Sequence, residues 1–275
     1  MRRATLWHYL GVLFIMFWGL APFYWMVIVA LRDKRYTFDT TPWPTHVTLE
    51  NFQDALATDK GNDFLGAIGN SLFISIATTS LAVLVGVFTA YALARLNFPG
   101  KGLVTGIILA ASMFPGIALV TPLFQLFGDL GWIGTYRAMI IPNISFALPL
   151  TIYTLVSFFR QLPWELEEAA RVDGASRGQA FRLVLLPLAA PALFTTAILA
   201  FIATWNEFML ARQLSTTATE PVTVAIARFS GPSAFEYPYA SIMAAGALVT
   251  VPLIIMVLIF QRRIVSGLTA GGVKA

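Results

Sequence analysis

Long apolar runs separated by short polar segments form the main pattern of this chain. Six runs reach the roughly 20 residues that a helix needs to cross about 30 Å of hydrocarbon, and they cover 7–31, 69–94, 103–128, 138–159, 185–210 and 241–261. Lysine and arginine are absent from all six. Each run must be a helix, because lipid offers no hydrogen-bond partner to a backbone. The pattern predicts an all-α integral membrane protein, with six transmembrane helices in a single domain over 1–275.

Composition and charge agree with this prediction and narrow the class of protein. Of the 275 residues, 57% are hydrophobic and 12% are charged, whereas soluble domains carry about 25% charged residues. The net charge of +4 comes from basic residues at the ends of apolar runs, so we do not expect nucleic-acid binding. There is no cysteine, and the two histidines, His8 and His46, lie in different segments. Thiol chemistry is therefore excluded, and an imidazole metal site is not expected.

Basic residues also predict the orientation of the helices. With the N-terminus inside, most of the 18 lysines and arginines fall in cytoplasmic segments, and the positive-inside rule then places both termini in the cytoplasm. The largest external loop covers about 32–68. In this loop Thr48 is placed to cap a short helix with Leu49, Phe52 and Leu56 on one face. Such a helix would either lie on the membrane surface or dock an external partner.

A polar segment between the fourth and fifth runs, 161–187, departs from the apolar pattern. Pro163 suits a first helical position, and the acids that follow it complement the dipole at a helix start. Gly174 is a natural stop, because glycine enters the left-handed conformation without steric cost. Ser176 followed by Gln179 is a capping box that predicts a second short helix. By itself the pattern fits either a lever gripped by a cytoplasmic protein or an amphipathic helix on the membrane surface.

The same segment resembles the EAA loop that marks the membrane subunits of binding-protein-dependent ABC importers. The shared pattern consists of Glu168-Ala169-Ala170, three residues, Gly174, nine residues, and then Val184, Leu185, Leu186 and Pro187. Other stretches are similar to the sugar-importing branch of that family, and within it to the maltose/trehalose-type permeases; these are 70-NSLFISIATTSLAVLVGVFTAYALARLNFPGK-101, 204-TWNEF-208 and 260-FQRRIVSGLTAGGVKA-275. The resemblance implies a type I ABC importer permease fold, with a cytoplasmic coupling helix between spans four and five.

The resemblance also assigns residues to the contact with a cytoplasmic ATPase. The coupling residues would be Glu168, Ala169, Ala170, Asp173, Gly174, Leu186 and Pro187. In the tail, the residues that would reach the ATPase dimer interface are Gly267, Leu268, Thr269 and Gly271. Without that contact, the glycine-rich end 267–275 would be a frayed terminus. This chain has no GxxxxGK[ST] loop, so ATP and Mg²⁺ would bind to the ATPase and no cofactor would bind to this chain.

By the same resemblance, the chain is expected to be a non-catalytic subunit of an ATP-driven importer in the bacterial cytoplasmic membrane. Its partners would be an ABC ATPase dimer, a second homologous permease, an extracytoplasmic sugar-binding protein (free or a lipoprotein) and membrane lipid. The expected cargo is a di- or oligosaccharide such as trehalose or maltose, and another polar solute, such as a glycerol phosphodiester, is the alternative. A secondary transporter would need intramembrane charge pairs, which the apolar runs do not provide.

Polar residues inside the apolar runs are the candidates for the translocation path. They are Asn143, Ser145 and Tyr153 in the fourth run and Asn206 and Glu207 in the fifth. For Asn143 and Glu207, a structural hydrogen bond is the alternative role. Prolines interrupt the third and fourth runs at Pro115, Pro122, Pro142 and Pro149, and kinks would suit helices that move.

Overall fold

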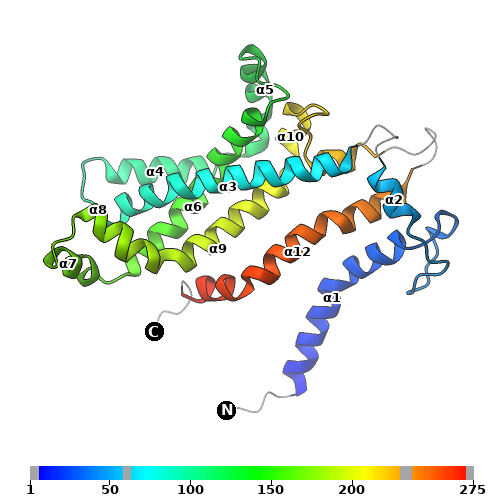
Figure 1. Cartoon of the computed structure of the whole chain (residues 1–275), viewed down its shortest axis with the longest axis horizontal. Helices are drawn as coiled ribbons and strands as arrows, with labels where there is room; N and C mark the ends of the chain where they lie inside the picture. Colours follow the sequence, from blue (N-terminus) through cyan, green and yellow to red (C-terminus); the bar gives the residue numbers. More distant parts are fainter. Residues whose placement is uncertain (1–5, 58–62, 230–236, 271–275) are drawn as a thin grey trace. The chain divides into compact units, whose positions relative to one another are not determined.

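The described part of the protein is helical. The computed structural model describes residues 6–57, 63–229 and 237–270 (Figure 1), and outside the helices its one isolated β-bridge pairs Arg32 with Val47. In chain order the elements are α1 Leu6–Ala30, η1 Lys34–Tyr36, α2 Glu50–Leu56, α3 Phe64–Arg95, α4 Lys101–Ser112, η2 Gly116–Leu119, α5 Val120–Asp129, α6 Tyr136–Gln161, α7 Glu165–Val172, α8 Arg177–Ala180, η3 Phe181–Leu185, α9 Leu186–Trp205, α10 Met209–Leu214, α11 Val222–Ala227 and α12 Tyr239–Ala270.

The predicted membrane spans are present as helices. Within the described residues, five helices are long and apolar enough to cross a membrane, and they cover Trp7–Ala30, Phe64–Arg95, Tyr136–Gln161, Arg177–Trp205 and Tyr239–Gln261. A bent pair of shorter helices, α4 with η2 and α5, makes up to a sixth span. The prediction of an all-helical membrane protein is confirmed, and its spans number five or six according to how the bent pair is counted.

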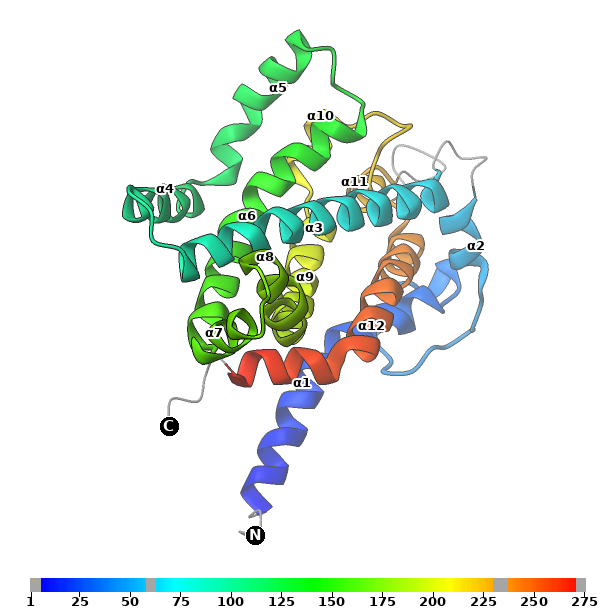
Figure 2. The ribbon, with the colours of Figure 1, turned by 60° about the vertical axis from the view of Figure 1, so that its left-hand side comes forward.

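The third span is not the continuous helix that the run at 103–128 suggested. The segments on either side of the break between α4 and η2 are bent by 89° (Figure 2). Pro115 explains this break, because proline has no N–H to continue the helical hydrogen bonds and disfavours a helical conformation in the preceding residue, Phe114. Pro142 and Pro149, by contrast, lie inside the uninterrupted helix α6.

Two other spans end at positions that differ from the prediction. Helix α9 ends at Trp205 instead of continuing to 210, and Asn206 is its C-cap. Glu207 therefore lies outside the helix, in the link to α10. Helix α12 continues to Ala270, past the predicted end of its span at 261. It thus enters the glycine-rich stretch for which a frayed terminus was the alternative to an ATPase contact. Once a helix is formed, each added residue gains a backbone hydrogen bond at low cost, which is why the span does not stop with its apolar run.

Contacts group the chain into two compact units, one of residues 1–68 with 224–254 and one of residues 69–223 with 255–275. In the second unit the inner faces of α3, α6, η3 and α9 pack around a core of Val87, Ala90, Leu155, Phe159, Phe181, Leu185, Ala189 and Ala192. Gly86 allows α3 to approach α6 closely, because a Cβ added there would lie 2.5 Å from the Cγ2 atom of Thr151.

The first unit contains α1, α2 and the first half of α12. Its buried apolar residues include Ile28, Val29, Ala30, Ala55, Ala240, Ala244 and Ala245. On α2 the buried residues are Asn51 and Ala55, whereas Leu49 is exposed and Phe52 and Leu56 are partly buried. The Asn51 amide turns inward because it donates to two backbone carbonyls, at 2.6 and 2.9 Å.

Candidate functional site

The polar segment 161–187, which we call the elbow, folds as two short helices between α6 and α9 (Figure 2). Its first helix, α7, begins at Glu165 with Trp164 as the N-cap. Pro163 therefore precedes the helix instead of occupying its first position, because the Trp164 carbonyl accepts the first helical bonds, from the N–H groups of Glu167 and Glu168 at 3.0 and 3.2 Å. The three glutamates of the first turn of α7 complement its dipole.

Gly174 ends α7 as the sequence predicted. It has a φ of +90°, a conformation that glycine adopts readily because it has no Cβ. Next to it, the N–H groups of Asp173 and Ala175 donate to the carbonyls of Ala169 and Ala170, at 3.0 and 2.9 Å. The last turn of the helix is thus closed on itself, as in common helix C-caps.

The predicted capping box at the start of α8 is also confirmed. The Ser176 hydroxyl accepts from the N–H of Gln179 at 3.3 Å, and the Gln179 side-chain oxygen accepts from the N–H of Ser176 at 2.7 Å. A closed C-cap and a capping box joined by two residues leave the turn little freedom. The elbow is therefore a defined turn between two helices.

One face of α7 is free and the opposite face is held. Glu165, Glu168, Ala169 and Val172 are all exposed, and their spacing of three and four residues places them on one side of a helix. Val172 is 86% exposed, although it is an apolar side chain. Glu167 points the other way and is only 8% exposed. The free face combines two acids with small or apolar side chains, and Val172 was not among the predicted coupling residues.

The held face of α7 is bound to the C-terminal end of α3. The Tyr91 hydroxyl donates to Oε1 of Glu167 at 3.0 Å. The guanidinium of Arg95 donates to the Leu162 carbonyl at 2.6 Å and lies 4.4 Å from the centre of the Trp164 ring. Sequence reasoning missed these contacts. Tyr91 and Arg95 are four residues apart at the end of a span, which was the available signal, but nothing local identified their partners.

An aromatic cluster connects the elbow to the spans from its other end. The segment η3 at Phe181–Leu185 is a π-helical turn that leads directly into α9. The Phe181 ring lies 4.6 Å from the ring of Tyr91 and 6.3 Å from that of Phe159. Leu185 beside it is fully buried. Leu186 is partly buried and Pro187 is exposed. Packed side chains thus connect the elbow to α3, α6 and α9.

A hollow of about 580 Å³ opens beside the held face of α7. It is lined by Arg95, Leu96, Asn97, Phe98, Trp164, Glu167, Glu168, Arg171 and Arg177. Three arginines and two glutamates make this hollow strongly polar. Glu168 belongs both to this lining and to the free face of the helix, so it stands at the border between them.

The predicted path residues are not all brought together. Asn143 and Glu207 line a polar cavity of about 10 Å³, the room of about one water molecule. The Glu207 carboxylate accepts from the N–H groups of Leu210 and Ala211 at 2.8 and 3.0 Å, and so caps α10. Asn143 donates to the carbonyl four residues back, at 2.9 Å. In this conformation Asn143 and Glu207 both make hydrogen bonds of the structural kind that was the alternative to a role in the translocation path.

The other path residues lie away from that cavity. Ser145, Tyr153 and Asn206 are exposed and are not among its lining residues. Ser145 and Asn206 each donate to a carbonyl of their own helix, at 3.3 and 2.8 Å. Residues that sequence reasoning missed here are the hydroxyl side chains of α3, because Ser71 and Ser75 also line the cavity.

The predicted ATPase-contacting tail is only partly within the described residues. Gly267, Leu268 and Thr269 lie in the last turns of α12. Gly271 lies outside the described residues.

A set of candidate membrane spans with a charged, folded elbow between two of them fits a transport permease. The chain belongs to the family of binding-protein-dependent transport system inner membrane components, whose model matches residues 82–269. It is thus a non-catalytic permease subunit of an ABC importer and a multi-pass inner-membrane protein. Permeases of this family carry no cofactor, and ATP binds to the ATPase with which they and a periplasmic binding protein form a complex.

Individual relatives place the chain among carbohydrate permeases. The trehalose transport system permease protein SugB of Mycobacterium tuberculosis is 48% identical, over 99% of this chain and 98% of its own length. The trehalose/maltose transport system permease protein MalG of Thermococcus litoralis is 42% identical, over 93% of this chain and 91% of its own length. The protein is accordingly a permease of a carbohydrate ABC importer.

A solved structure shares the fold at much lower sequence identity. A bacterial ABC transporter involved in the import of the acidic polysaccharide alginate matches with a TM-score of 0.76, at 21% identity, over 95% of this chain and 98% of its own. At this identity the likeness concerns the fold alone. It agrees with an all-helical permease fold.

Proposed function

We propose that this chain is a permease of an importer for trehalose, maltose or a closely related disaccharide. Its similarity to permeases named for trehalose and maltose, along nearly the whole chain, supports this cargo. The lining of the small cavity also fits a neutral sugar, because it contains hydroxyl, amide and carboxylate groups and no basic residue. A cavity of about 10 Å³ is too small for a disaccharide, so the path opens only when the helices move, as alternating access requires.

The elbow is the seat of the ATPase in this proposal. Glu168 pairs with a basic residue of the ATPase, with Asp173 as a second polar contact. Ala169 and Ala170 allow close approach, Gly174 makes the turn, and Leu186 and Pro187 tie the elbow to α9. The observation that carries the proposal is the division of α7 into a free face with Glu168 and a held face bound to α3 through Glu167. A helix held on one side and free on the other can receive force and pass it on.

The remaining partners and the orientation follow from the same proposal. The elbow and both termini face the cytoplasm, where the last turns of α12 with Gly267, Leu268 and Thr269, and Gly271 beyond them, reach the ATPase dimer. A second homologous permease completes the path, and an external sugar-binding protein delivers the cargo. Asn143, Ser145, Tyr153, Asn206 and Glu207 contribute to the path wall when the helices rearrange.

Substitution of Glu168 by lysine tests this coupling. Loss of a charge pair that becomes buried on docking costs about 2–5 kcal/mol, so we expect trehalose uptake to fall at least tenfold while membrane insertion is unchanged. Uptake of labelled trehalose is measured together with ATPase activity in proteoliposomes of the complete importer. Gly102→Lys is the matched control, because it adds the same side chain at an exposed position outside the elbow, at the start of α4, where nothing lies within 4 Å of an added Cβ.

Two results would contradict the proposal in different ways. Normal uptake by Glu168→Lys, at confirmed protein levels, would remove the elbow's coupling role. If excess maltose does not reduce trehalose uptake whereas an excess of a glycerol phosphodiester does, the proposed cargo would be wrong and the coupling role would stand.

A further inference from the structure

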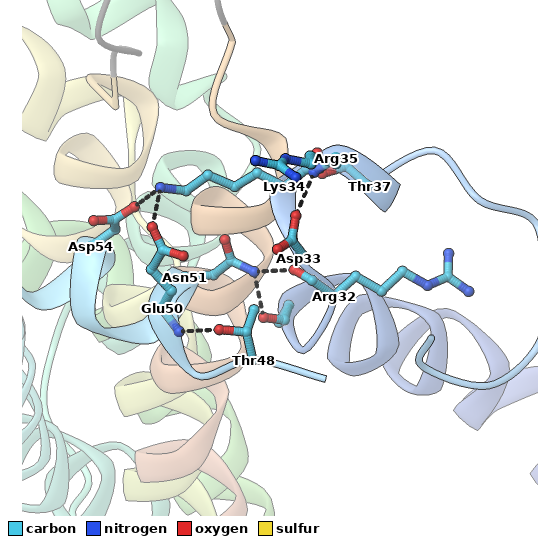
Figure 3. Close-up of polar contacts among 10 residues, drawn as sticks. Arg32, Asp33, Lys34, Arg35, Thr37, Thr48, Glu50, Asn51 and Asp54 are labelled. Atoms are coloured by element: carbon cyan, nitrogen blue, oxygen red, sulfur yellow. Dashed lines mark hydrogen bonds and ion pairs between the residues drawn. The ribbon is translucent and has the colours of Figure 1, made fainter. Parts of the chain in front are cut away.

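The chain between α1 and α2, residues 31–49, is a folded loop with a closed base; we call it the α1–α2 loop. At its base Asp33 and Thr48 donate from their N–H groups to the carbonyls of His46 and Leu31, at 3.1 and 2.8 Å. The buried Asn51 amide donates to the Arg32 carbonyl at 2.6 Å, as drawn in Figure 3. The loop therefore leaves α1 and returns to α2 in one defined conformation.

The loop folds back along the last turns of α1. The Tyr24 hydroxyl donates to the Pro42 carbonyl at 2.6 Å, and Tyr24 lies six residues before the end of α1 at Ala30. At a rise of 1.5 Å per residue this is about 9 Å below the end of the helix. Side chains on a helix lean toward its N-terminus. The Tyr24 side chain therefore does not extend toward the C-terminal end of α1, and the loop must fold back to meet it. Pro42 and its neighbour Trp43 thus lie beside the membrane-spanning part of α1.

A second contact fixes the depth of the loop independently. The Phe38 ring packs edge-on against the Tyr239 ring, with 5.4 Å between their centres. Tyr239 is the first residue of the candidate span at Tyr239–Gln261, and the Tyr237 ring lies 4.7 Å from it. Tyrosines at the start of a span are typical of the membrane–water interface. Phe38 therefore lies at the level where the sixth span enters the membrane.

The polar groups around Arg32 and Asp39 are turned inward, whereas Lys34 and Arg35 stay exposed. Arg32 is fully buried and donates to the carbonyls of Asp39, Thr41 and Trp43, and its guanidinium lies 5.1 Å from the centre of the Trp25 ring. The Asp39 carboxylate accepts from the hydroxyls of Thr41 and Thr45, at 3.0 and 2.9 Å. Backbone carbonyls and charges that would resist contact with lipid are thereby satisfied within the loop.

Large apolar rings are turned outward instead. Phe38 is 79% exposed and Trp43 is 61% exposed. They continue the exposed apolar surface of α1, where Phe17, Trp18 and Leu20 are each more than half exposed. A soluble loop of this size would hide its rings and show its polar groups to water. In the α1–α2 loop these two rings are exposed although Arg32 is fully buried.

We propose that the α1–α2 loop is a membrane anchor, seated in the interface of the leaflet at the end of α1, with Phe38 and Trp43 among the lipid headgroups and upper acyl chains. Amphipathic rings such as that of tryptophan favour this layer. The anchor holds the end of α1 to the start of α12 at a fixed depth. The external binding protein is the alternative occupant of these rings. The two contacts that fix the depth of the loop, and the continuity of the rings with the exposed apolar surface of α1, favour lipid.

Spin labels report the depth directly, and the absence of native cysteine makes single labels possible. The full chain is placed in phosphatidylcholine/phosphatidylglycerol nanodiscs as Phe38→Cys, as Trp43→Cys and, for the control, as Gln53→Cys at an exposed position on α2. Power saturation then compares collisions with oxygen, which concentrates in lipid, and with a water-soluble nickel chelate. We expect the oxygen-to-nickel ratio to exceed one at positions 38 and 43 and to fall below one at position 53.

Three outcomes would overturn the anchor. A ratio below one at both 38 and 43 would place the rings in water. Shielding from both reagents in the nanodisc would show that protein covers them. A lipid-like ratio that is lost, with label immobilisation, when the binding protein is added would make the loop a docking surface. Each readout compares labels in the same protein, and native near-ultraviolet circular dichroism of each variant shows that it is folded.

Discussion

The elbow and the α1–α2 loop are both polar segments that join membrane helices, yet they turn opposite groups outward. The elbow exposes Glu168 and buries aromatic rings, including Phe181, among its supporting spans. The α1–α2 loop buries Arg32 completely, beside the buried Asn51 of α2, and exposes Phe38 and Trp43. A charged surface fits a protein partner in water, whereas a surface of rings fits the membrane interface. The role of a polar segment therefore depends on which side chains it exposes, and its composition alone does not decide which ones these are.

Replacing Asn51 by alanine is expected to have the largest effect on the loop. It removes two hydrogen bonds of a fully buried amide and leaves two carbonyls without this donor, at a cost of about 1–3 kcal/mol. Hydrogen exchange of the Asp33 and Thr48 amides should become several-fold faster. Gln53→Ala, at an exposed position on the same helix, should leave both rates unchanged. Equal protection in the two variants would show that the loop base does not depend on Asn51.

Gly174→Ala in the elbow is expected to have a somewhat smaller effect. A Cβ in the left-handed conformation costs about 1–2 kcal/mol, and no neighbouring atom lies within 4 Å of it, so the cost is conformational. Gly178→Ala is a matched control, because that glycine is equally open but has no positive φ. Exchange at the Ala175 amide and trehalose uptake should suffer in the first variant only. If the two variants behave alike, the turn at Gly174 is not a mechanical requirement.

The smallest effect is expected from the surface ion pairs of Lys34 in the α1–α2 loop, which bind Glu50 and Asp54 at 3.0 and 2.6 Å (Figure 3). The carboxylate of Asp54, and after it that of Glu50, raises the pKa of Lys34, against the opposing effect of its partial burial. Because the pKa of Lys34 is higher in the folded than in the unfolded state, its ion pairs stabilise the folded state fully at pH values below the unfolded pKa of about 10.4. This stabilisation is lost as the pH rises through the higher folded pKa.

Removing Lys34 should therefore cost only about 0.2–1 kcal/mol at neutral pH. The measurement compares amide protection of the loop in wild type and Lys34→Met at matched pH values. Their difference should vanish once the pH exceeds the raised pKa. Arg35→Met serves as the control for loss of an exposed cation, and a difference that persists at high pH would exclude the ion pairs as its source.

Most of the secondary structure followed from the sequence, and its errors have local causes. The elbow's stop at Gly174 and its capping box depend on residues within a few positions of each other, so they were predictable. The bend at Pro115 was visible as an interruption, but its size depends on how the two halves pack. The apolar pattern of α2 did not identify its buried residue Asn51, whose carbonyl partners lie 21 and 19 positions away.

The sequence by itself determined that this is a helical membrane protein with an EAA-type elbow, since span length, backbone hydrogen bonding and motif spacing are all properties of short segments. Only the tertiary structure decided how that elbow is held and which side of it is free. Tyr91 and Glu167 are separated by 76 positions, and Phe38 meets Tyr239 across most of the chain. Such contacts arise from the packing of whole helices, and no local pattern of residues specifies them.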